Sequence, residues 1–200
     1  IRKDNLTHLL YRAVGKPDPL VSSESGLSTI GKAVSLDDEH FKDRRQFIVP
    51  EEEWERFGCE DPRVTFFEGR YYIFYTALSS FPPRPESIKV GLAISDDLET
   101  IQEKHLVTPF NAKAMALFPE RVNGKIVAVL TAHTDEPPTK IALVECNRIE
   151  ELWEESFWKK WHEGIDAHRL NPLRFDSDHV EVGRDTVSGC LRGLGPLFCL

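Results

Sequence analysis

The amino-acid sequence predicts an all-β chain built from repeated groups of short antiparallel strands, as in a β-propeller. The first observation is a repeat: LLYRA, IFYTA and AVLTA occupy residues 9–13, 73–77 and 128–132 and resemble one another. The second is a constant spacing, because the turn glycines Gly69 and Gly124 are 55 residues apart. The third is the scarcity of helical periodicity. Strand pairs joined by Gly-containing turns are typical of β-hairpins.

A second strand-like segment follows each of these repeats. The three copies are IGKAVS, VGLAIS and KIALVE, at residues 30–35, 90–95 and 140–145. The repeating unit is therefore about 50 to 60 residues, the size of one four-stranded propeller blade. β-Sandwiches also contain many short strands, but sequence repetition at a fixed period favours the propeller.

The pattern predicts individual elements. We expect strands at 7–13, 28–35, 63–67, 71–77, 88–95, 115–122, 125–132 and 139–145. We also expect one short amphipathic helix within 149–161, where aromatic residues recur at helical spacing. At about 55 residues per blade, 200 residues provide only three to four blades. Residues 1–183 are expected to form this incomplete propeller domain, and 184–200 an aberrant tail that matches no repeat position.

Composition narrows the classes of partner. The chain has 25 Lys and Arg against 33 Asp and Glu, a net charge of −8, and no apolar run long enough to span a membrane. This charge argues against a nucleic-acid partner and an anionic membrane surface. The four cysteines form no CxxC pair, so we expect free thiols, no metal site and a cytoplasmic location. We also expect no signal peptide, although the given sequence begins with Ile1 rather than Met.

The most specific string is GCEDPR at 58–63. A carboxylic acid at the start of a strand near a propeller axis could protonate a leaving oxygen, with Arg63 holding charge or geometry. The alternative is an ordinary turn at Asp61 and an ion pair between Glu60 and Arg63.

Two further residues lie at corresponding places of the repeat. Lys113 belongs to the string NAKAMALFPE and could meet an anion or a sugar hydroxyl, or be a solvated surface lysine. Arg12 lies at the end of the first repeat strand, where the later copies carry Thr76 and Thr131. His133 and Asp135 are interpreted as turn residues.

The strings HLLYRA, FGCEDPRVT, YYIFYTA, KVGLAISDDL and ALFPERVNGK resemble glycoside hydrolase family 130, over about residues 5 to 183. This resemblance implies a five-bladed β-propeller and an inverting enzyme that cleaves β-mannosides by phosphorolysis or hydrolysis. It also implies that Asp61 is the catalytic acid, that Arg12 lines the mannosyl site, and that Glu60 and Arg63 neighbour the acid.

The sequence departs from the pattern of the phosphorylases, which hold phosphate with two arginines. Here Lys113 and Thr131 stand at those positions, so a dianion would be held less well. The expected substrate is a β-mannoside oligosaccharide, and no cofactor is expected. The sequence does not decide whether inorganic phosphate is a co-substrate or whether the chain forms a homo-oligomer. The competing interpretation is a non-catalytic carbohydrate-binding propeller fragment.

Overall fold

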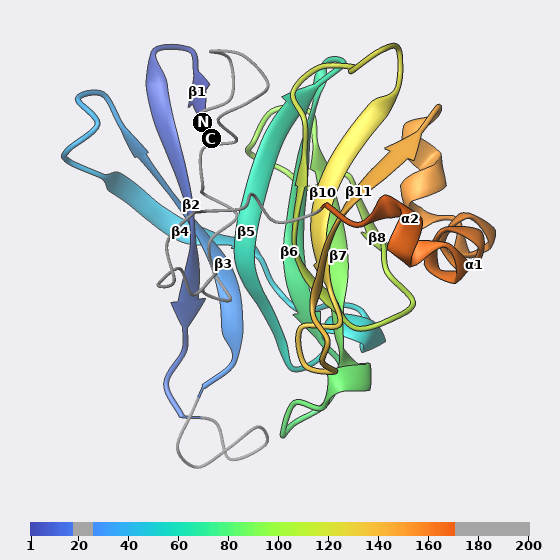
Figure 1. Ribbon diagram of the computed structural model, residues 1–200. Coiled ribbons are helices and arrows are strands. Elements are labelled where there is room, and N and C mark those ends of the chain that lie inside the picture. Colours follow the sequence, from blue (N-terminus) through green and yellow to red (C-terminus); the bar gives the residue numbers. More distant parts are fainter. Residues whose placement is uncertain (18–25, 171–200) are drawn as a thin grey trace, which may run out of the picture. The chain divides into compact units, whose positions relative to one another are not determined.

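A computed structural model describes residues 1–17 and 26–170, in which most of the regular structure is β-strand (Figure 1). The predicted all-β class is confirmed. The predicted tail at 184–200 and the boundary at 183 lie outside the described residues. The strands are β1 (Arg2–Lys3), β2 (Leu6–Val14), β3 (Ser28–Ser35), β4 (Lys42–Ile48), β5 (Gly58–Phe67), β6 (Arg70–Leu78), β7 (Ile88–Ser95), β8 (Glu103–Leu106), β9 (Ala112–Leu117), β10 (Ile126–Ala132) and β11 (Lys140–Cys146).

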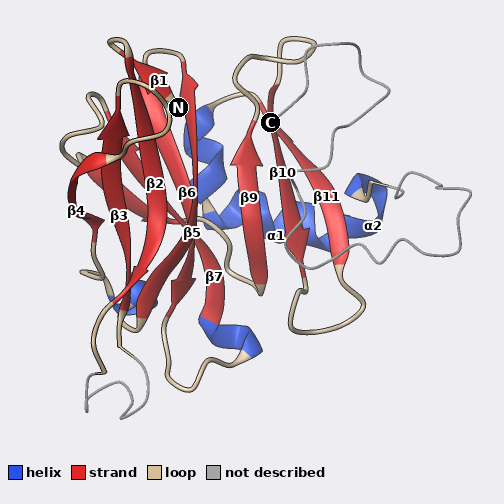
Figure 2. Ribbon diagram, turned by 90° about the vertical axis from the view of Figure 1, so that its left-hand side faces the viewer, coloured by secondary structure: helices blue, strands red, loops and turns tan. Residues whose placement is uncertain are grey.

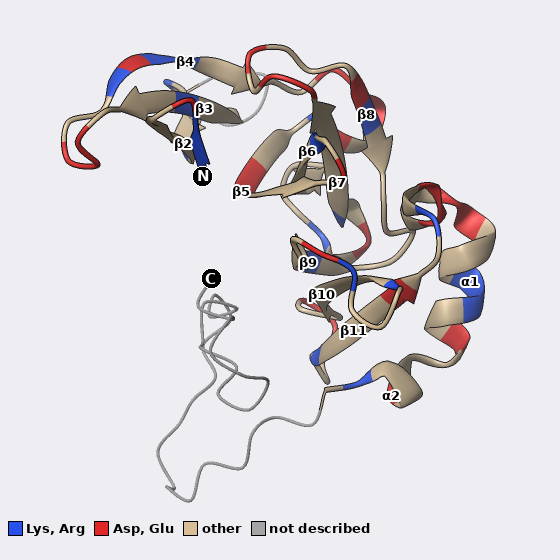
Figure 3. Ribbon diagram, turned by 90° about the horizontal axis from the view of Figure 1, so that it is seen from above, with Lys and Arg blue, Asp and Glu red and all other residues tan. Residues whose placement is uncertain are grey.

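The strands form three consecutive antiparallel groups, here called modules: β1–β4, β5–β8 and β9–β11. The first two modules share a hydrogen-bonded sheet through one parallel bridge between Ser28 and Gly58, whereas the third is a separate sheet. Figure 3 shows the second module between the first and the third. Within the described residues the modules form no closed ring.

The sequence repeat reflects a repeated contact between an aromatic ring and a glycine. Tyr11 pairs with Gly31 in the first module, and Tyr75 pairs with Gly91 in the second. A Cβ atom at Gly31 would lie 2.5 Å from the Tyr11 ring, and one at Gly91 would lie 2.7 Å from the Tyr75 ring. These two glycines are therefore required by close packing.

The third module replaces this contact with smaller partners, since Leu130 pairs with Ala142. The shared register makes Arg12, Thr76 and Thr131 equivalent, because each directly follows the residue that makes this contact. The predicted equivalence of these three positions is confirmed.

Within the middle module, β6 is buried on both faces, which explains its nearly continuous apolar sequence. Alternate side chains of a strand point to opposite faces. Tyr71, Ile73 and Tyr75 belong to a core shared with the first module, whereas Tyr72 and Phe74 belong to a core shared with the third.

The predicted helix is confirmed and is divided in two. A 3-10 helix, η3 (Ile149–Trp153), precedes α1 (Glu155–Glu163), and a further turn forms α2 (Ile165–His168). Trp158 and Trp161 of α1 are buried in the core of the third module, and Trp161 Nε1 donates to the Leu143 carbonyl at 3.2 Å. Figure 2 shows α1 beside the β9–β11 sheet. No helix among the described residues is long and apolar enough to cross a membrane.

Several strand predictions need correction. The strand expected at 63–67 begins earlier, since β5 is Gly58–Phe67. The strand expected at 115–122 lies at Ala112–Leu117, and it ends before Pro119, which lacks the N–H that a continuing strand would donate. Three further strands, β1, β4 and β8, were not expected. The sequence of β4, KDRRQFI, is mostly charged and exposed, which is how edge strands avoid pairing with other chains but which hides the apolar alternation.

Candidate active site

The GCEDPR string lies inside β5 rather than before it, and it contains a β-bulge. Glu60 pairs with Thr76 and Arg63 pairs with Phe74, so two residues oppose one on the partner strand. Asp61 occupies the bulge with φ +51° and its side chain is exposed. A non-glycine residue with positive φ is uncommon, and bulges often redirect side chains next to active sites.

The third module has the same irregularity in β9. Its register shifts between Lys113, which pairs with Thr131, and Ala116, and Ala114 has φ +54°. Lys113 is thus the equivalent of Glu60, and Ala114 is the equivalent of Asp61. Asp61 carries a carboxylate that the corresponding position of the third module lacks.

Arg12 and Glu60 come together across the boundary between the first two modules. Arg12 Nη2 lies 2.6 Å from Glu60 Oε1, and Arg12 Nε donates to Ser28 Oγ at 3.2 Å. The Glu60 side chain is 15% exposed and that of Arg12 is 43% exposed. The pair therefore lies at the edge of the buried region, directly before the bulge that carries Asp61.

Arg63 lies on the other side of the bulge. Its guanidinium donates to the main-chain carbonyl of Asp61 at 3.2 Å, which braces the bulged backbone. The proposed alternative, an ion pair between Glu60 and Arg63, is replaced by the pair between Glu60 and Arg12. Four of the five predicted site residues therefore lie together: Arg12 pairs with Glu60, Glu60 precedes Asp61, and Arg63 donates to the Asp61 carbonyl.

Lys113 pairs instead with Asp135, on the loop after β10. Lys113 Nζ lies 3.2 Å from both carboxylate oxygens of Asp135. Thr134 Oγ1 donates to Asp135 Oδ2 at 2.7 Å, and Asn111 Nδ2 donates to the same oxygen at 3.1 Å. Burial opposes ionisation of Asp135, but hydrogen bonds from Thr134, Asn111 and Lys113 outweigh it and lower the pKa of this carboxyl.

Asp135 and Asn111 are residues that sequence reasoning missed as parts of a site. Asp135 looked like a turn residue because it stands in a short polar loop. The sequence did carry a signal for this contact. Asp135 closely follows the repeat strand that ends at Ala132, and Asn111 directly precedes β9, the strand that pairs with it. No linear motif joins two residues whose contact depends on strand pairing.

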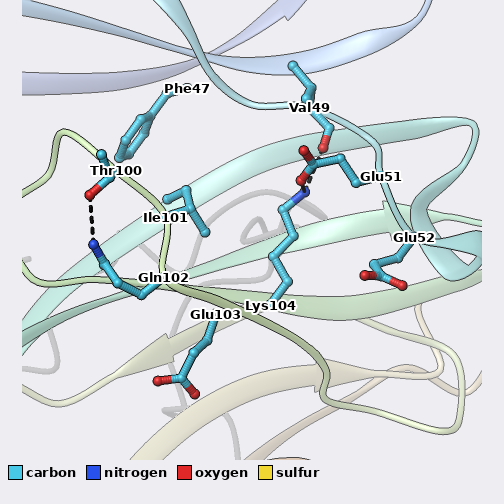
Figure 4. Close-up of a pocket in the computed structure, with 9 residues that line it drawn as sticks. All are labelled: Phe47, Val49, Glu51, Glu52, Thr100, Ile101, Gln102, Glu103 and Lys104. Carbon is cyan, nitrogen blue, oxygen red and sulfur yellow. Dashed lines mark hydrogen bonds and ion pairs between the residues drawn. The ribbon is translucent and has the colours of Figure 1, made fainter.

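A separate pocket of about 470 Å3 lies between the chain around Glu51 and the chain around Lys104. None of the five predicted site residues lines this pocket. Figure 4 shows the Lys104 side chain pointing toward Glu51 and the Val49 carbonyl. Lys104 Nζ also lies 2.8 Å from Oε1 of Glu55, which is fully buried.

The buried pair of Glu55 and Lys104 stabilises the fold, since the partners of Glu55 include the buried side chains of Tyr75 and Cys59. Burial disfavours the Glu55 carboxylate, but hydrogen bonds from Lys104 and Tyr75 outweigh that cost and lower the pKa of Glu55. Cys59 Sγ donates to Glu55 Oε2 at 3.3 Å, and burial raises the pKa of the Cys59 thiol. A thiol kept protonated in this way is a poor nucleophile. Among residues 1–17 and 26–170, no group of three or more His, Cys, Asp or Glu side chains is arranged to hold a metal ion.

Comparisons with known proteins agree on one family. Its sequence profile, described as beta-1,4-mannooligosaccharide phosphorylase of glycoside hydrolase family 130, matches residues 20–177. A 1,2-beta-oligomannan phosphorylase from Thermoanaerobacter sp. (strain X514) is 34% identical over 137 residues, which cover 68% of this chain and 45% of that protein. A beta-1,2-mannobiose phosphorylase from Listeria innocua is 34% identical over 107 residues, 52% of this chain and 28% of that protein. The chain thus spans less than half the length of these relatives.

Solved structures show the same relationship. A beta-1,2-mannobiose phosphorylase from Listeria innocua in complex with beta-1,2-mannobiose matches with a TM-score of 0.53 at 28% identity, over 63% of this chain and 35% of that one. A family 117 glycoside hydrolase from Zobellia galactanivorans matches with a TM-score of 0.57 at 19% identity, over 74% and 51% of the two chains, which shows a shared fold alone. Because the family profile covers most of the sequence, this chain belongs to glycoside hydrolase family 130.

Proposed function

We propose that this chain is part of an enzyme that cleaves β-mannosidic bonds with inversion at the anomeric carbon, by phosphorolysis or hydrolysis. Asp61 is the proposed general acid. The observation that carries the proposal is its position in the β5 bulge, exposed to solvent and directly after Glu60, which is ion-paired to Arg12. Membership of the family supports the same assignment.

The arrangement suits an inverting reaction. A carboxylic acid donates a proton toward the leaving oxygen while a nucleophile attacks the anomeric carbon from the opposite face. In the proposed site Arg12, Glu60 and Arg63 hold sugar hydroxyl groups around Asp61, since charged donors and acceptors make the strongest hydrogen bonds. Lys113 is the proposed contact for a further substrate group.

The proposed substrate is a β-mannoside oligosaccharide, and no organic cofactor or metal is required by this chemistry. The similar proteins from Thermoanaerobacter and Listeria are named for β-1,2 linkages, which supports β-1,2-mannobiose as the first substrate to try. The family profile is named for β-1,4 linkages, so a β-1,4-linked mannobiose is the second.

We further propose that the three modules belong to a five-bladed β-propeller, with 1–183 as the propeller portion of this chain. The repeated Tyr–Gly contact and the repeated bulge support this view, because blades related by rotation present equivalent residues at equivalent places. The tail at 184–200 is proposed to depart from the repeat.

A second candidate function is carbohydrate binding without catalysis. The observation in its favour is that Thr131, the strand partner of Lys113, adds no second cation beside Lys113 that could help to hold an anionic nucleophile. A binding fragment would keep the Arg12–Glu60 pair and Asp61 but lack groups that activate a nucleophile.

One assay separates these functions. The purified chain is incubated with β-1,2-mannobiose, with and without inorganic phosphate, and the products are followed by NMR. Release of α-mannose 1-phosphate with phosphate, or of α-mannose without it, is expected for the enzyme. Binding of mannobiose with no product would favour the binding fragment, and absence of both would contradict the proposed function.

A further inference from the structure

The boundaries between the modules are equivalent in backbone but differ in charge. At the first boundary Arg12 pairs with Glu60. By the repeat register, the residues at the second boundary that correspond to Arg12 and Glu60 are Thr76 and Lys113. The Arg–Glu ion pair at the first boundary is thus replaced by a Thr and a Lys at the second boundary.

Thr76 cannot supply the charge that Lys113 needs. Its hydroxyl oxygen is buried and has no hydrogen-bond partner within the described residues. Lys113 is instead neutralised from within its own module, because Asp135 places both carboxylate oxygens 3.2 Å from the ammonium group.

Hydrogen bonds from neighbouring residues fix the position of Asp135 beside Lys113. Besides the bonds from Thr134 and the Asn111 amide, its own backbone N–H donates to Asn111 Oδ1 at 3.0 Å. The Asp135 and Lys113 side chains are 26% and 33% exposed, so their attraction is screened only in part. The low pKa of Asp135 means that the carboxylate is ionised near neutral pH.

A neutralised lysine binds different ligands from a free one. Inorganic phosphate is a mixture of monoanion and dianion near pH 7 and is favoured by uncompensated cations. A sugar hydroxyl is uncharged and can accept from an ammonium group that also contacts a carboxylate.

We propose that Asp135 sets the ligand preference of the Lys113 subsite, so that the subsite receives an uncharged sugar hydroxyl and disfavours phosphate. The inference rests on the proposed function for the identity of the sugar. It assigns Asp135 as a positioning residue that acts through Lys113, and it favours water over phosphate as the nucleophile in the proposed reaction.

The test titrates inorganic phosphate into the full chain at pH 7.5 by isothermal titration calorimetry. Asp135→Asn removes the charge and retains the shape, and it is expected to tighten phosphate binding about tenfold because one opposing charge next to Lys113 is gone. Adding Lys113→Ala should abolish the gain. Glu136→Gln is the matched control, because it removes one carboxylate from the neighbouring position, where Glu136 faces His133 Nδ1 at 3.7 Å. It should change phosphate binding less than twofold.

Other outcomes would overturn the inference. It is wrong if Asp135→Asn binds phosphate no better than the wild type, or if the gain survives Lys113→Ala. Should Asp135→Asn fail to fold, the wild type decides: a Lys113→Ala variant that loses more than fivefold in phosphate affinity shows that Lys113 already holds phosphate, and an unchanged affinity supports the inference.

These titrations are independent of the cleavage assay. If Asp135→Asn gains Lys113-dependent phosphate binding while the wild type cleaves no mannobiose, the charge inference stands and the proposed cleavage activity is contradicted. If the wild type cleaves mannobiose while Asp135→Asn shows no such gain, the cleavage activity stands and the charge inference is contradicted.

Discussion

Arg12 Nη2 and Glu60 Oε1 lie 2.6 Å apart, and this ion pair joins the first module to the second directly beside the bulge that carries Asp61. The two residues are 48 positions apart in the sequence. Their contact gives the proposed site a fixed edge, because the first module is otherwise joined to β5 by packing and by the single bridge between β3 and β5.

The first prediction concerns this ion pair. A double-mutant cycle with Arg12→Met and Glu60→Gln should give a coupling energy of about 1 kcal/mol, since the pair is only partly exposed. The measurement is urea unfolding at low and at 0.5 M salt, with a smaller coupling in salt. A coupling near zero at both salt concentrations would show that the pair does not hold the modules together.

The second prediction concerns catalysis. Asp61→Asn should reduce mannobiose cleavage by at least ~100-fold while mannobiose binding is retained, because an amide cannot donate the proton. Asn accepts positive φ readily, so the bulge should persist. Asp43→Asn is the matched control, since Asp43 is also exposed and has φ +54°. Full activity of Asp61→Asn would remove Asp61 from the role of acid.

The third prediction concerns the repeated Tyr–Gly contact. Gly91→Ala should lower the free energy of unfolding by about 1 to 3 kcal/mol, because its Cβ would lie 2.7 Å from both the Tyr75 and Trp54 rings. Gly164→Ala is the control, with its nearest atom at 3.7 Å. Equal unfolding midpoints for the two variants would contradict the steric argument.

The fourth prediction concerns the buried pair of Glu55 and Lys104. Lys104→Met should destabilise the protein by about 3 to 5 kcal/mol, since it leaves the buried Glu55 carboxylate without its cationic partner. Glu55→Gln should cost less, because Lys104 keeps its ion pair with Glu51 at 2.8 Å. The double variant should lose less than the sum of the two. Chemical denaturation of all three variants measures this, and additive losses would mean that the two charges do not depend on each other.

The fifth prediction concerns pH. Burial lowers the pKa of His162, and the nearby His133, at 3.1 Å between the Nε2 atoms, and Lys140 act in the same direction. The unfolded chain therefore binds a proton on this residue at a higher pH than the folded chain does. This contribution to stability is present above the unfolded pKa and is lost as the pH falls.

Stability should accordingly decline between about pH 7 and pH 5, with His162 contributing at most about 1.4 kcal/mol per pH unit. His162→Gln should flatten this decline in thermal unfolding measurements. His168→Gln is the control, because His168 stacks on Trp161 instead of facing His133. A decline of the same steepness in the His162 variant would contradict the assignment.

Much of the fold follows from the sequence. Strand-forming residues, turn glycines and a spacing of 55 residues are local or periodic features, and hydrogen bonding between neighbouring strands turns them into equivalent modules. The predicted edges of β3, β6, β7 and β10 therefore agree closely with the structure. The charged edge strand β4 was not predicted, because it pairs with β3 through backbone hydrogen bonds and its sequence shows no apolar alternation.

The strand repeat, the family and the carboxylate in GCEDPR can all be recognised in the amino-acid sequence. Which charged side chains meet depends on the folded arrangement of the modules. Arg12 reaches Glu60 because one module packs on the next, and Asp135 reaches Lys113 because the loop after β10 returns beside β9. Both pairs join residues more than twenty positions apart, and their attraction falls steeply with distance. A pattern along the chain carries no such distance, so the charge balance of the site could come only from the folded arrangement.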